Sequence, residues 1–196
     1  MLTAADPVTW SPRRVAVAGV SGAGKTTLSR RVATTLGVPH TEIDALFHGE
    51  DWQPRSSFES DVAAVIGGAG WVIEWMYPSV RDAIVRRADT LVWLDLPFPL
   101  VFARLLRRTL RRSIRREVLW NGNVEPALRT LFTDPDHILR WAVRTRRHLR
   151  QRVPPLLEAL PELHIVRLRS RRDVETWLRM LAGASPLAPP PGQGRR

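Results

Sequence analysis

The sequence predicts an α/β fold in which helices cover both faces of a parallel sheet. Short, almost continuous apolar segments alternate along the 196 residues with longer amphipathic segments. Strands that are buried on both faces form apolar runs, whereas a helix that lies on a sheet needs only one apolar stripe. The alternation is therefore typical of a parallel sheet between two helical layers. With 44% hydrophobic residues, the chain has enough apolar side chains for one compact domain.

The first strand and the first helix have the clearest boundaries. Residues 13–19 (RRVAVAG) form a β-branched run that ends in glycine, which predicts a buried strand. A glycine-rich turn follows, and residues 26–36 then form an amphipathic helix that Gly37 ends as a C-cap. Residues 39–44 (PHTEID) predict the second strand.

The middle of the chain continues the alternation. Helices are predicted over 57–66, which begins at serine caps and ends at a GGAG sequence, and over 79–88. Strands are predicted over 71–75 and over 90–97, where proline stops the run. A long helix over about 98–116 carries one apolar stripe, and arginines occupy its other positions.

The C-terminal third predicts the last strand between two helices. The helices cover 134–152 and 171–181, and the strand covers 163–168. The expected organisation is a single folded domain over 13–182. The polar, proline-containing segment 1–12 and the segment 183–196 flank it, and the latter is too rich in proline and glycine to pack. We expect both ends to be flexible.

Composition excludes several kinds of site. The chain has no cysteine, which excludes disulfides and thiolate metal sites, and its five histidines lack metal-ligand spacing. No apolar run approaches the roughly 20 residues of a membrane-spanning helix. These features predict a cytoplasmic protein. The net charge of +11 predicts attraction to anions, which include nucleic acid, acidic lipid headgroups and phosphorylated small molecules.

The strongest functional signal is the sequence GVSGAGKT at 19–26, which meets the P-loop pattern G-x-x-x-x-G-K-[ST] in full. Glycines let backbone N–H groups turn toward phosphate oxygens, and the helix that follows presents its positive N-terminal end to the same anion. The motif therefore predicts binding of a nucleotide. The expected nucleotide-binding residues are Gly19, Ser21, Gly22, Ala23, Gly24, Lys25, Thr26 and Thr27.

Lys25 is the only lysine among the 30 Lys and Arg residues of the chain. Its ammonium is a compact charge on a flexible stem, so it reaches the β- and γ-phosphates where a planar guanidinium would fit badly. We expect Lys25 to be catalytic. The Thr26 hydroxyl is expected to bind Mg²⁺, and Thr27 is a candidate for contact with the α-phosphate.

Five segments together carry a family resemblance: GVSGAGKTTLSRRVA, EIDALFH, RRADTLVWLDLP, LLRRTLRR and LWNGN. They resemble bacterial topology-modulation or adenylate-kinase-like proteins, which belong to the nucleoside-monophosphate-kinase-like branch of P-loop phosphotransferases. The resemblance covers residues 13–181. It implies a three-layer P-loop NTPase fold, a five-stranded parallel sheet in the order 2-3-1-4-5, a helical lid, and ATP as the donor.

The chain departs from this family after the third strand. Where its members usually carry Asp-Gly-Asn-Tyr, this chain has Glu74, Trp75, Met76 and Tyr77. The carboxylate is kept in a longer form, but a glycine and a polar asparagine have become large apolar residues. The change predicts either an altered acceptor pocket or a weakened activity.

Three carboxylates lie at or just beyond the ends of predicted strands, where ligands of such sheets bind. Asp44 follows the second strand, where related kinases place an acid that contacts the acceptor or activates its hydroxyl; a helix-capping role is the alternative. Glu74 is the candidate for a Mg²⁺-bound water. Asp95 matches a Walker-B pattern better, but in this branch its position resembles a structural aspartate. We therefore rank Glu74 above Asp95 as a metal residue.

Arginines in the segment 104–117 are expected to lead into the lid and to clamp the transferred phosphoryl group. The candidates are Arg108, Arg112, Arg115 and Arg116. Of these, Arg112 and Arg116 lie one turn apart on one helix face and are predicted to be catalytic.

Two other kinds of side chain are candidates for the acceptor site. The only two asparagines of the chain lie in LWNGN at 119–123, which predicts either a binding loop or a plain structural turn. Trp52 and Trp75 are the candidates for stacking on an acceptor ring.

We favour an ATP- and Mg²⁺-dependent phosphotransferase whose acceptor is a small molecule or a nucleotide. A nucleic-acid-associated ATP-binding protein is suggested by the charge of +11, but no nucleic-acid motif supports it. A regulatory nucleotide-binding module with little turnover is a third hypothesis, suggested by the altered segment 74–77. The sequence leaves the acceptor and the oligomeric state open.

Overall fold

Five parallel strands form the centre of the protein, in a computed structural model that describes residues 1–115, 117–123 and 138–184. The strands are β1 (Arg14–Gly19), β2 (His40–Thr41), β3 (Trp71–Glu74), β4 (Thr90–Leu94) and β5 (His164–Leu168). Their spatial order is β2-β3-β1-β4-β5. This arrangement confirms the predicted α/β class and the strand order that the family resemblance implied.

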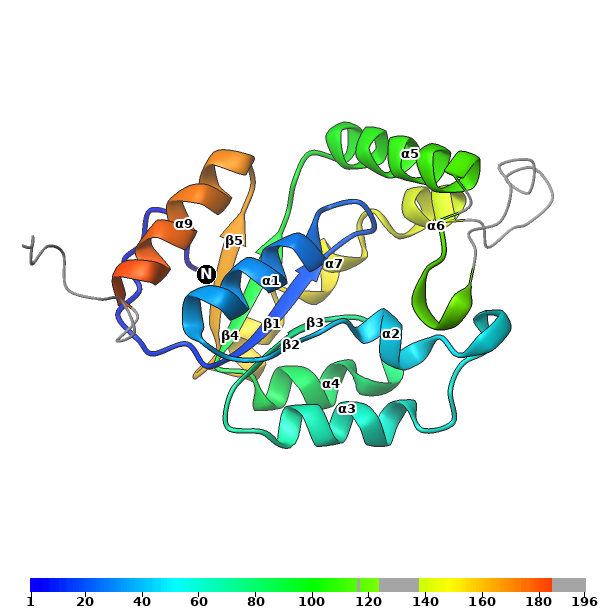
Figure 1. The fold of residues 1–196 in the computed structure, drawn as a ribbon. Coiled ribbons are helices and arrows are strands. Elements are labelled where there is room, and N and C mark those ends of the chain that lie inside the picture. The colour runs from blue at the N-terminus through cyan, green and yellow to red at the C-terminus, as the bar shows by residue number, and fades with distance from the viewer. Residues whose placement is uncertain (116, 124–137, 185–196) are drawn as a thin grey trace, which may run out of the picture.

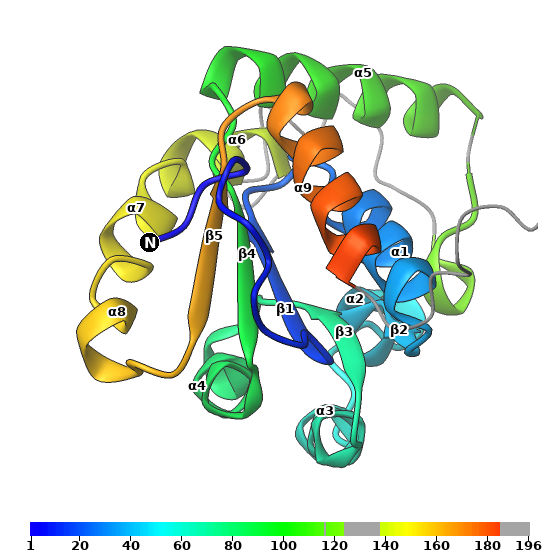
Figure 2. The same ribbon diagram turned by 90° about the vertical axis from the view of Figure 1, so that its left-hand side faces the viewer.

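Helices cover both faces of the sheet, as Figure 2 shows. On one face lie α1 (Lys25–Leu36) and α9 (Arg171–Ala184). On the other lie α3 (Phe58–Gly67) and α4 (Pro78–Arg87). The other described helices are α2 (Ile43–Phe47), α5 (Phe98–Arg115), α6 (Ile138–Thr145), α7 (His148–Arg152), α8 (Leu156–Ala159) and the 3-10 helices η1 (Glu50–Trp52) and η2 (Trp120–Gly122).

The core consists of one apolar layer on each face of the sheet. Side chains alternate along β1, so Val15 and Val17 pack toward α1 and α9, whereas Ala16 and Ala18 pack toward α3 and α4. All four are fully buried. A strand buried on both faces has no polar position, which explains why its sequence is an unbroken apolar run.

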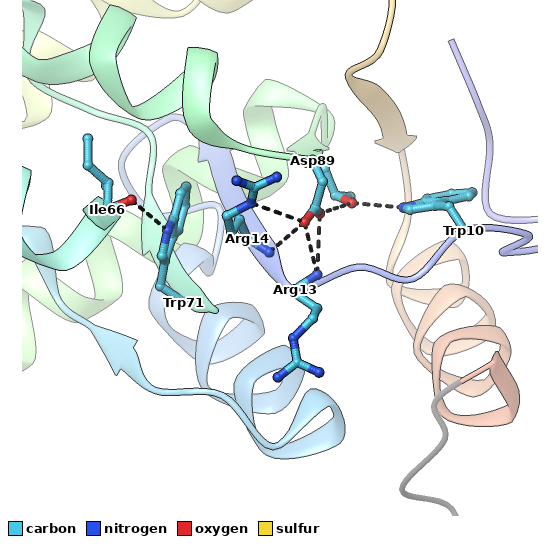
Figure 3. A network of polar contacts seen from close by, with 7 residues as sticks. Trp10, Arg13, Arg14, Ile66, Trp71 and Asp89 are labelled. Carbon is cyan, nitrogen blue, oxygen red and sulfur yellow. Dashed lines mark hydrogen bonds and ion pairs between the residues drawn. The ribbon is translucent and has the colours of Figure 1, made fainter. Parts of the chain in front are cut away.

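A polar network lies at the end of the sheet where β1 and β4 begin (Figure 3). The Asp89 carboxylate accepts hydrogen bonds from the backbone N–H groups of Arg13 and Arg14, at 3.1 and 2.8 Å, and from the Thr90 hydroxyl at 2.8 Å. The indole N–H of Trp10 donates to the same hydroxyl at 2.9 Å. This network joins the starts of two neighbouring strands. The predicted site residues lie at the opposite end of the sheet, where the strands end.

Residues 1–12 differ from the flexible segment that was expected. Leu2 pairs with β5: its N–H donates to Ile165 at 2.8 Å and its carbonyl accepts from Arg167 at 2.9 Å. Ala4 is buried, and Trp10 stacks on His164. The segment therefore lies along the edge strand β5 (Figure 2), because its backbone satisfies hydrogen-bonding groups that an edge strand leaves open.

Other boundaries also differ from the prediction, and the fourth strand, predicted over 90–97, ends at Leu94. The second strand ends at Thr41, and α2 already begins at Ile43, so Asp44 lies in the first turn of a helix. The described part of the helix predicted over 134–152 is divided into α6 and α7. Helix α9 continues to Ala184, and the rest of the tail predicted from 183 lies outside the described residues.

Within the described part of the chain, no helix is both long and apolar enough to cross a membrane. The cytoplasmic location stays a prediction.

Candidate active site

The predicted phosphate-binding residues surround the carboxyl end of the central strand. Gly19 ends β1, the segment 20–24 forms the turn, and Lys25, Thr26 and Thr27 form the first turn of α1. The other strands are parallel to β1, so Asp44 after β2, Glu74 at the end of β3 and Asp95 after β4 lie at the same edge of the sheet. Figure 1 shows α5 above the β1–α1 loop and α2 below it.

Two glycines of the loop have backbone conformations that L-amino acids rarely adopt. Gly22 has a φ of 86° and Gly24, the N-cap of α1, has a φ of 96°. Gly22 also lies directly against α5, since a Cβ built on it would be 2.7 Å from the Val101 carbonyl oxygen and 2.9 Å from the Leu105 Cβ. Glycine is therefore needed at position 22 for the turn and for the close approach of α5.

Gly22→Ala is expected to destabilise the fold and to abolish ATP binding. The positive φ alone costs about 1–3 kcal/mol for a residue with a Cβ, and the overlap with the α5 backbone adds to that cost. Urea unfolding and the ATP-dependent shift in melting temperature would measure both effects. Gly67→Ala is the matched control, since its Cβ would meet nothing within 4 Å. Wild-type stability and ATP response in Gly22→Ala would contradict the prediction.

Lys25 lies inside the turn. Its stem packs against Gly19, where an added Cβ would be 3.1 Å from the Lys25 Cγ, and its Nζ lies 3.5 Å from the Val20 carbonyl oxygen. Burial lowers the pKa of Lys25; the charges of Asp44 and Glu74 oppose this effect and that of Arg108 adds to it. Three charged side chains from different elements therefore lie within electrostatic reach of the ammonium.

Asp44 is held by the only tyrosine of the chain. The Tyr77 hydroxyl donates a hydrogen bond to Asp44 Oδ1 at 2.6 Å and lies 3.3 Å from His48 Nε2. The sequence analysis assigned no role to Tyr77, which it named only as the last residue of the segment 74–77 that departs from the family. It lies in the site because β3 ends beside α2, which brings residue 77 to residue 44.

Glu74 is buried, with 3% of its side chain exposed. One carboxylate oxygen accepts the backbone N–H of Ile43 at 3.0 Å, and the other lies 3.4 Å from His40 Nε2. Burial raises the pKa of Glu74, but the hydrogen bonds from His40 and Ile43 outweigh burial and hold the pKa below its usual value. Glu74 therefore carries a negative charge at the edge of the sheet beside the P-loop.

The arginines of α5 divide into two faces. Arg104, Arg107, Arg111 and Arg115 are exposed, whereas Arg108 and Arg112, one turn apart, are half-buried. Arg108 acts electrostatically on Lys25, and Arg112 Nε lies 3.6 Å from Glu117 Oε2. The sequence analysis named Arg108 as a lid candidate but predicted Arg112, and not Arg108, to be catalytic. Arg116, predicted to be catalytic, lies outside the described residues.

Asp95 has structural partners. It accepts hydrogen bonds from Arg150 Nε at 3.0 Å and from Arg167 Nε at 3.0 Å, and the Arg167 guanidinium lies over the Trp93 ring. These contacts tie the ends of β4 and β5 to α7. The assignment of Asp95 as a structural residue agrees with this geometry, and Glu74 as a metal residue stays a prediction.

Two cavities open beside Asp95, on the other side of the P-loop from Asp44. Their volumes are about 510 and 220 Å³, and both are lined by Asp95 and Arg150. Val20 of the P-loop also lines the smaller one, and Ser170 after β5 lines the larger one. Lys25 and Asp44 line neither cavity. Space therefore exists next to the P-loop on the β4–β5 side.

Trp75, a candidate for stacking on an acceptor, does not face the site. It is 4% exposed, and its indole N–H donates to the Arg81 carbonyl at 2.9 Å. Trp75 belongs to the apolar layer between the sheet and α3 and α4, whereas Tyr77, whose φ is 53°, contacts Asp44.

The LWNGN segment contacts the segment that carries Asp44. The Trp120 indole N–H donates to Glu42 Oε2 at 2.8 Å, and the Asn123 side chain donates to the Gly49 carbonyl at 2.7 Å and accepts the Trp52 N–H at 2.9 Å. Trp52 and Trp120 both lie against the His48 ring. The asparagines therefore join the chain after α5 to the segment 42–52.

Comparisons with solved structures show the fold. The chain is similar to a gluconokinase from Sinorhizobium meliloti 1021, with 20% identity, a TM-score of 0.51, and coverage of 88% of this chain and 93% of that chain. It is also similar to a shikimate kinase from Bacteroides thetaiotaomicron, with 18% identity, a TM-score of 0.50, and coverage of 87% and 97%. The fold is that of the P-loop kinases.

No family model matches the chain, and no curated protein matches it in sequence. The resemblance to topology-modulation proteins therefore stays a prediction.

Proposed function

We propose that this protein is a kinase that transfers the γ-phosphoryl group of Mg²⁺–ATP to the hydroxyl group of a small molecule. The observation that carries the proposal is the group formed by Lys25, Asp44 and Glu74 at the edge of the sheet, around a complete P-loop. The group combines a phosphate-binding turn, the Lys25 cation for the transferred group, and the Asp44 carboxylate. Among the described residues, Asp44 has no ion pair with an arginine or a lysine.

The residues have distinct roles in the proposed reaction. Backbone N–H groups of the P-loop hold the phosphates, and Lys25 follows the negative charge on the β- and γ-phosphates as the bond to the leaving group breaks. Asp44 accepts the proton of the attacking hydroxyl. Arg108, on the inner face of α5, stabilises the charge of the transferred group.

The oxygen donors at this edge fit Mg²⁺. Magnesium prefers oxygen ligands, keeps several waters, and is bound in such sites through few protein groups together with substrate phosphates. Thr26 supplies a hydroxyl, and Glu74 supplies a buried charge that attracts a metal-bound water. The described residues contain no group of three or more His, Cys, Asp or Glu side chains that would hold a metal alone. Magnesium would neutralise charge on the phosphates when it is bound.

The two sides of the P-loop suit the two substrates. The cavities beside Asp95 and Arg150 provide space for the base and ribose of ATP. Asp44 and Tyr77 lie on the β2–β3 side, which is therefore the acceptor side. Substrates on opposite sides of one phosphate loop meet at the γ-phosphate, as in-line transfer requires.

A hydroxyl acceptor is favoured over a monophosphate by the carboxylate. An alcohol loses a proton as it attacks, whereas a phosphate arrives ionised and would be repelled by Asp44. The names of the two similar structures denote kinases of small molecules, which supports the same class of acceptor. A nucleotide acceptor is the alternative, and the arginines of α5 would then be its clamps.

Mg²⁺–ATP at about 100 times its dissociation constant is expected to stabilise the protein by about 2.7 kcal/mol, because it binds only the folded state. Thermal and urea unfolding would measure this effect. Phosphorus NMR of ATP mixed with hydroxylated metabolites, nucleosides and nucleoside monophosphates would then identify the acceptor by its product. A melting temperature that ATP leaves unchanged would contradict ATP binding, and transfer to a monophosphate alone would replace the proposed acceptor.

A further inference from the structure

Tyr77 has a strained backbone at the start of a helix. It is the N-cap of α4, with a φ of 53° and a ψ of 116°. A bulky residue at a positive φ is an outlier that persists only where the surroundings hold it. Two rings hold it here: Phe47, stacked at a centroid distance of 4.0 Å, and Phe58, edge-on at 5.2 Å. In this conformation the phenol packs on Phe47 of α2, at the margin of the core.

The Tyr77 hydroxyl joins two residues of the acceptor side. It donates to Asp44 Oδ1, and the oxygen of the same hydroxyl is left to accept from His48 Nε2. Burial raises the pKa of Tyr77, and the negative charges of Asp44 and Glu74 raise it further. The phenol therefore keeps its proton and stays a donor to Asp44 at physiological pH.

The contact uses only one oxygen of the carboxylate. Among the described residues, no hydrogen bond reaches Asp44 Oδ2. A carboxylate fixed through Oδ1 has a defined rotamer and presents Oδ2 for another proton. This orientation is what a general base needs, since proton transfer depends on geometry first.

We propose that Tyr77 is a positioning residue, whose hydroxyl fixes the Asp44 carboxylate so that Oδ2 faces the acceptor hydroxyl. The inference rests on the proposed function, because it assigns Tyr77 a role through the base of that reaction. The chemical consequence is that an acceptor with a hydroxyl reaches Oδ2 within hydrogen-bonding distance, beside the aromatic rings of Phe47 and Tyr77.

A double-mutant cycle on kcat tests this role. Tyr77→Phe removes the hydroxyl and keeps the ring, and it should lower kcat by up to about 100-fold through a misplaced base, with KM for ATP nearly unchanged. In the Asp44→Asn background, the same change should have less than about a twofold further effect, because the two residues act as one unit. Equal losses in both backgrounds, or a wild-type kcat in Tyr77→Phe, would overturn the proposal.

A spectroscopic readout tests the contact without any acceptor. The chain has one tyrosine, so incorporation of fluorotyrosine gives a single fluorine NMR signal from position 77. Asp44→Asn should shift this signal and move its alkaline titration to lower pH, since the negative carboxylate that the phenol donates to becomes a neutral amide. The control Asp82→Asn, an exposed residue of α4, should do neither.

The two readouts separate the proposals. Without phosphoryl transfer in any assay, the proposed function fails although the fluorine signal still reports the contact. If transfer is normal and depends on Asp44, but Asp44→Asn leaves the fluorine signal unmoved, the role of Tyr77 fails and the proposed function stands.

Discussion

Lys25→Arg is expected to abolish phosphoryl transfer although it keeps the positive charge. The Lys25 stem lies against Gly19, and its ammonium lies 3.5 Å from the Val20 carbonyl within the turn. A guanidinium is wider and planar, so it would displace the loop or the γ-phosphate. Loss of one electrostatic contact to the transferred group costs about 10²–10³ in kcat, and displacement of the phosphates adds to it. Single-turnover transfer from labelled ATP would measure the loss.

Arg31→Lys is the matched control for this exchange. Arg31 lies on the same helix, but it pairs with Glu175 of α9 at the surface. It should keep wild-type turnover, because an exposed ion pair contributes little and either cation maintains it. Near-normal activity in Lys25→Arg would mean that the only lysine of the chain is not the phosphate-binding cation.

Much of the fold could be predicted because its signals are local. The glycine conformations at 22 and 24 and the sole lysine belong to one turn, so their residues are adjacent in the sequence. The apolar strands could be predicted equally well, since a strand that is buried on both faces has no polar position. The strand order came from the family resemblance, because nothing in the residues of one strand specifies its neighbour.

The contacts of the carboxylates could not be predicted, because they join residues that are distant in sequence. The Tyr77–Asp44 hydrogen bond spans 33 residues, and the His40–Glu74 contact spans 34. The first depends on where α2 begins after the short edge strand β2, whose end was predicted three residues too late, and the second depends on the pairing of β2 with β3. The prediction that Trp75 lies in the site was wrong. The strand was expected to continue to residue 75, whereas β3 ends at Glu74, and the directions of the side chains beyond that point could not be predicted.

Asp44→Asn is expected to lower kcat by about 10²- to 10⁴-fold, the usual range for loss of a general base. The amide has nearly the same shape as the carboxylate, and its oxygen still accepts the hydrogen bond of Tyr77, so the fold should be kept. ATP affinity should be nearly unchanged, because Asp44 lies on the acceptor side of the P-loop. Steady-state kinetics with the acceptor from the NMR screen, together with ATP titrations, would separate the two effects.

The same variant distinguishes the two classes of acceptor. A hydroxyl must lose its proton during attack, so its phosphorylation depends on Asp44; a monophosphate is already ionised and depends on positive charge instead. Arg108→Gln and Arg112→Gln would remove that charge from the inner face of α5. If Asp44→Asn transfers at nearly the wild-type rate while these two variants fail, the acceptor is a monophosphate. The Asp44 carboxylate, 2.6 Å from the half-buried Tyr77 phenol, would then hold α2 against the start of α4. Tyr77 would share that structural role.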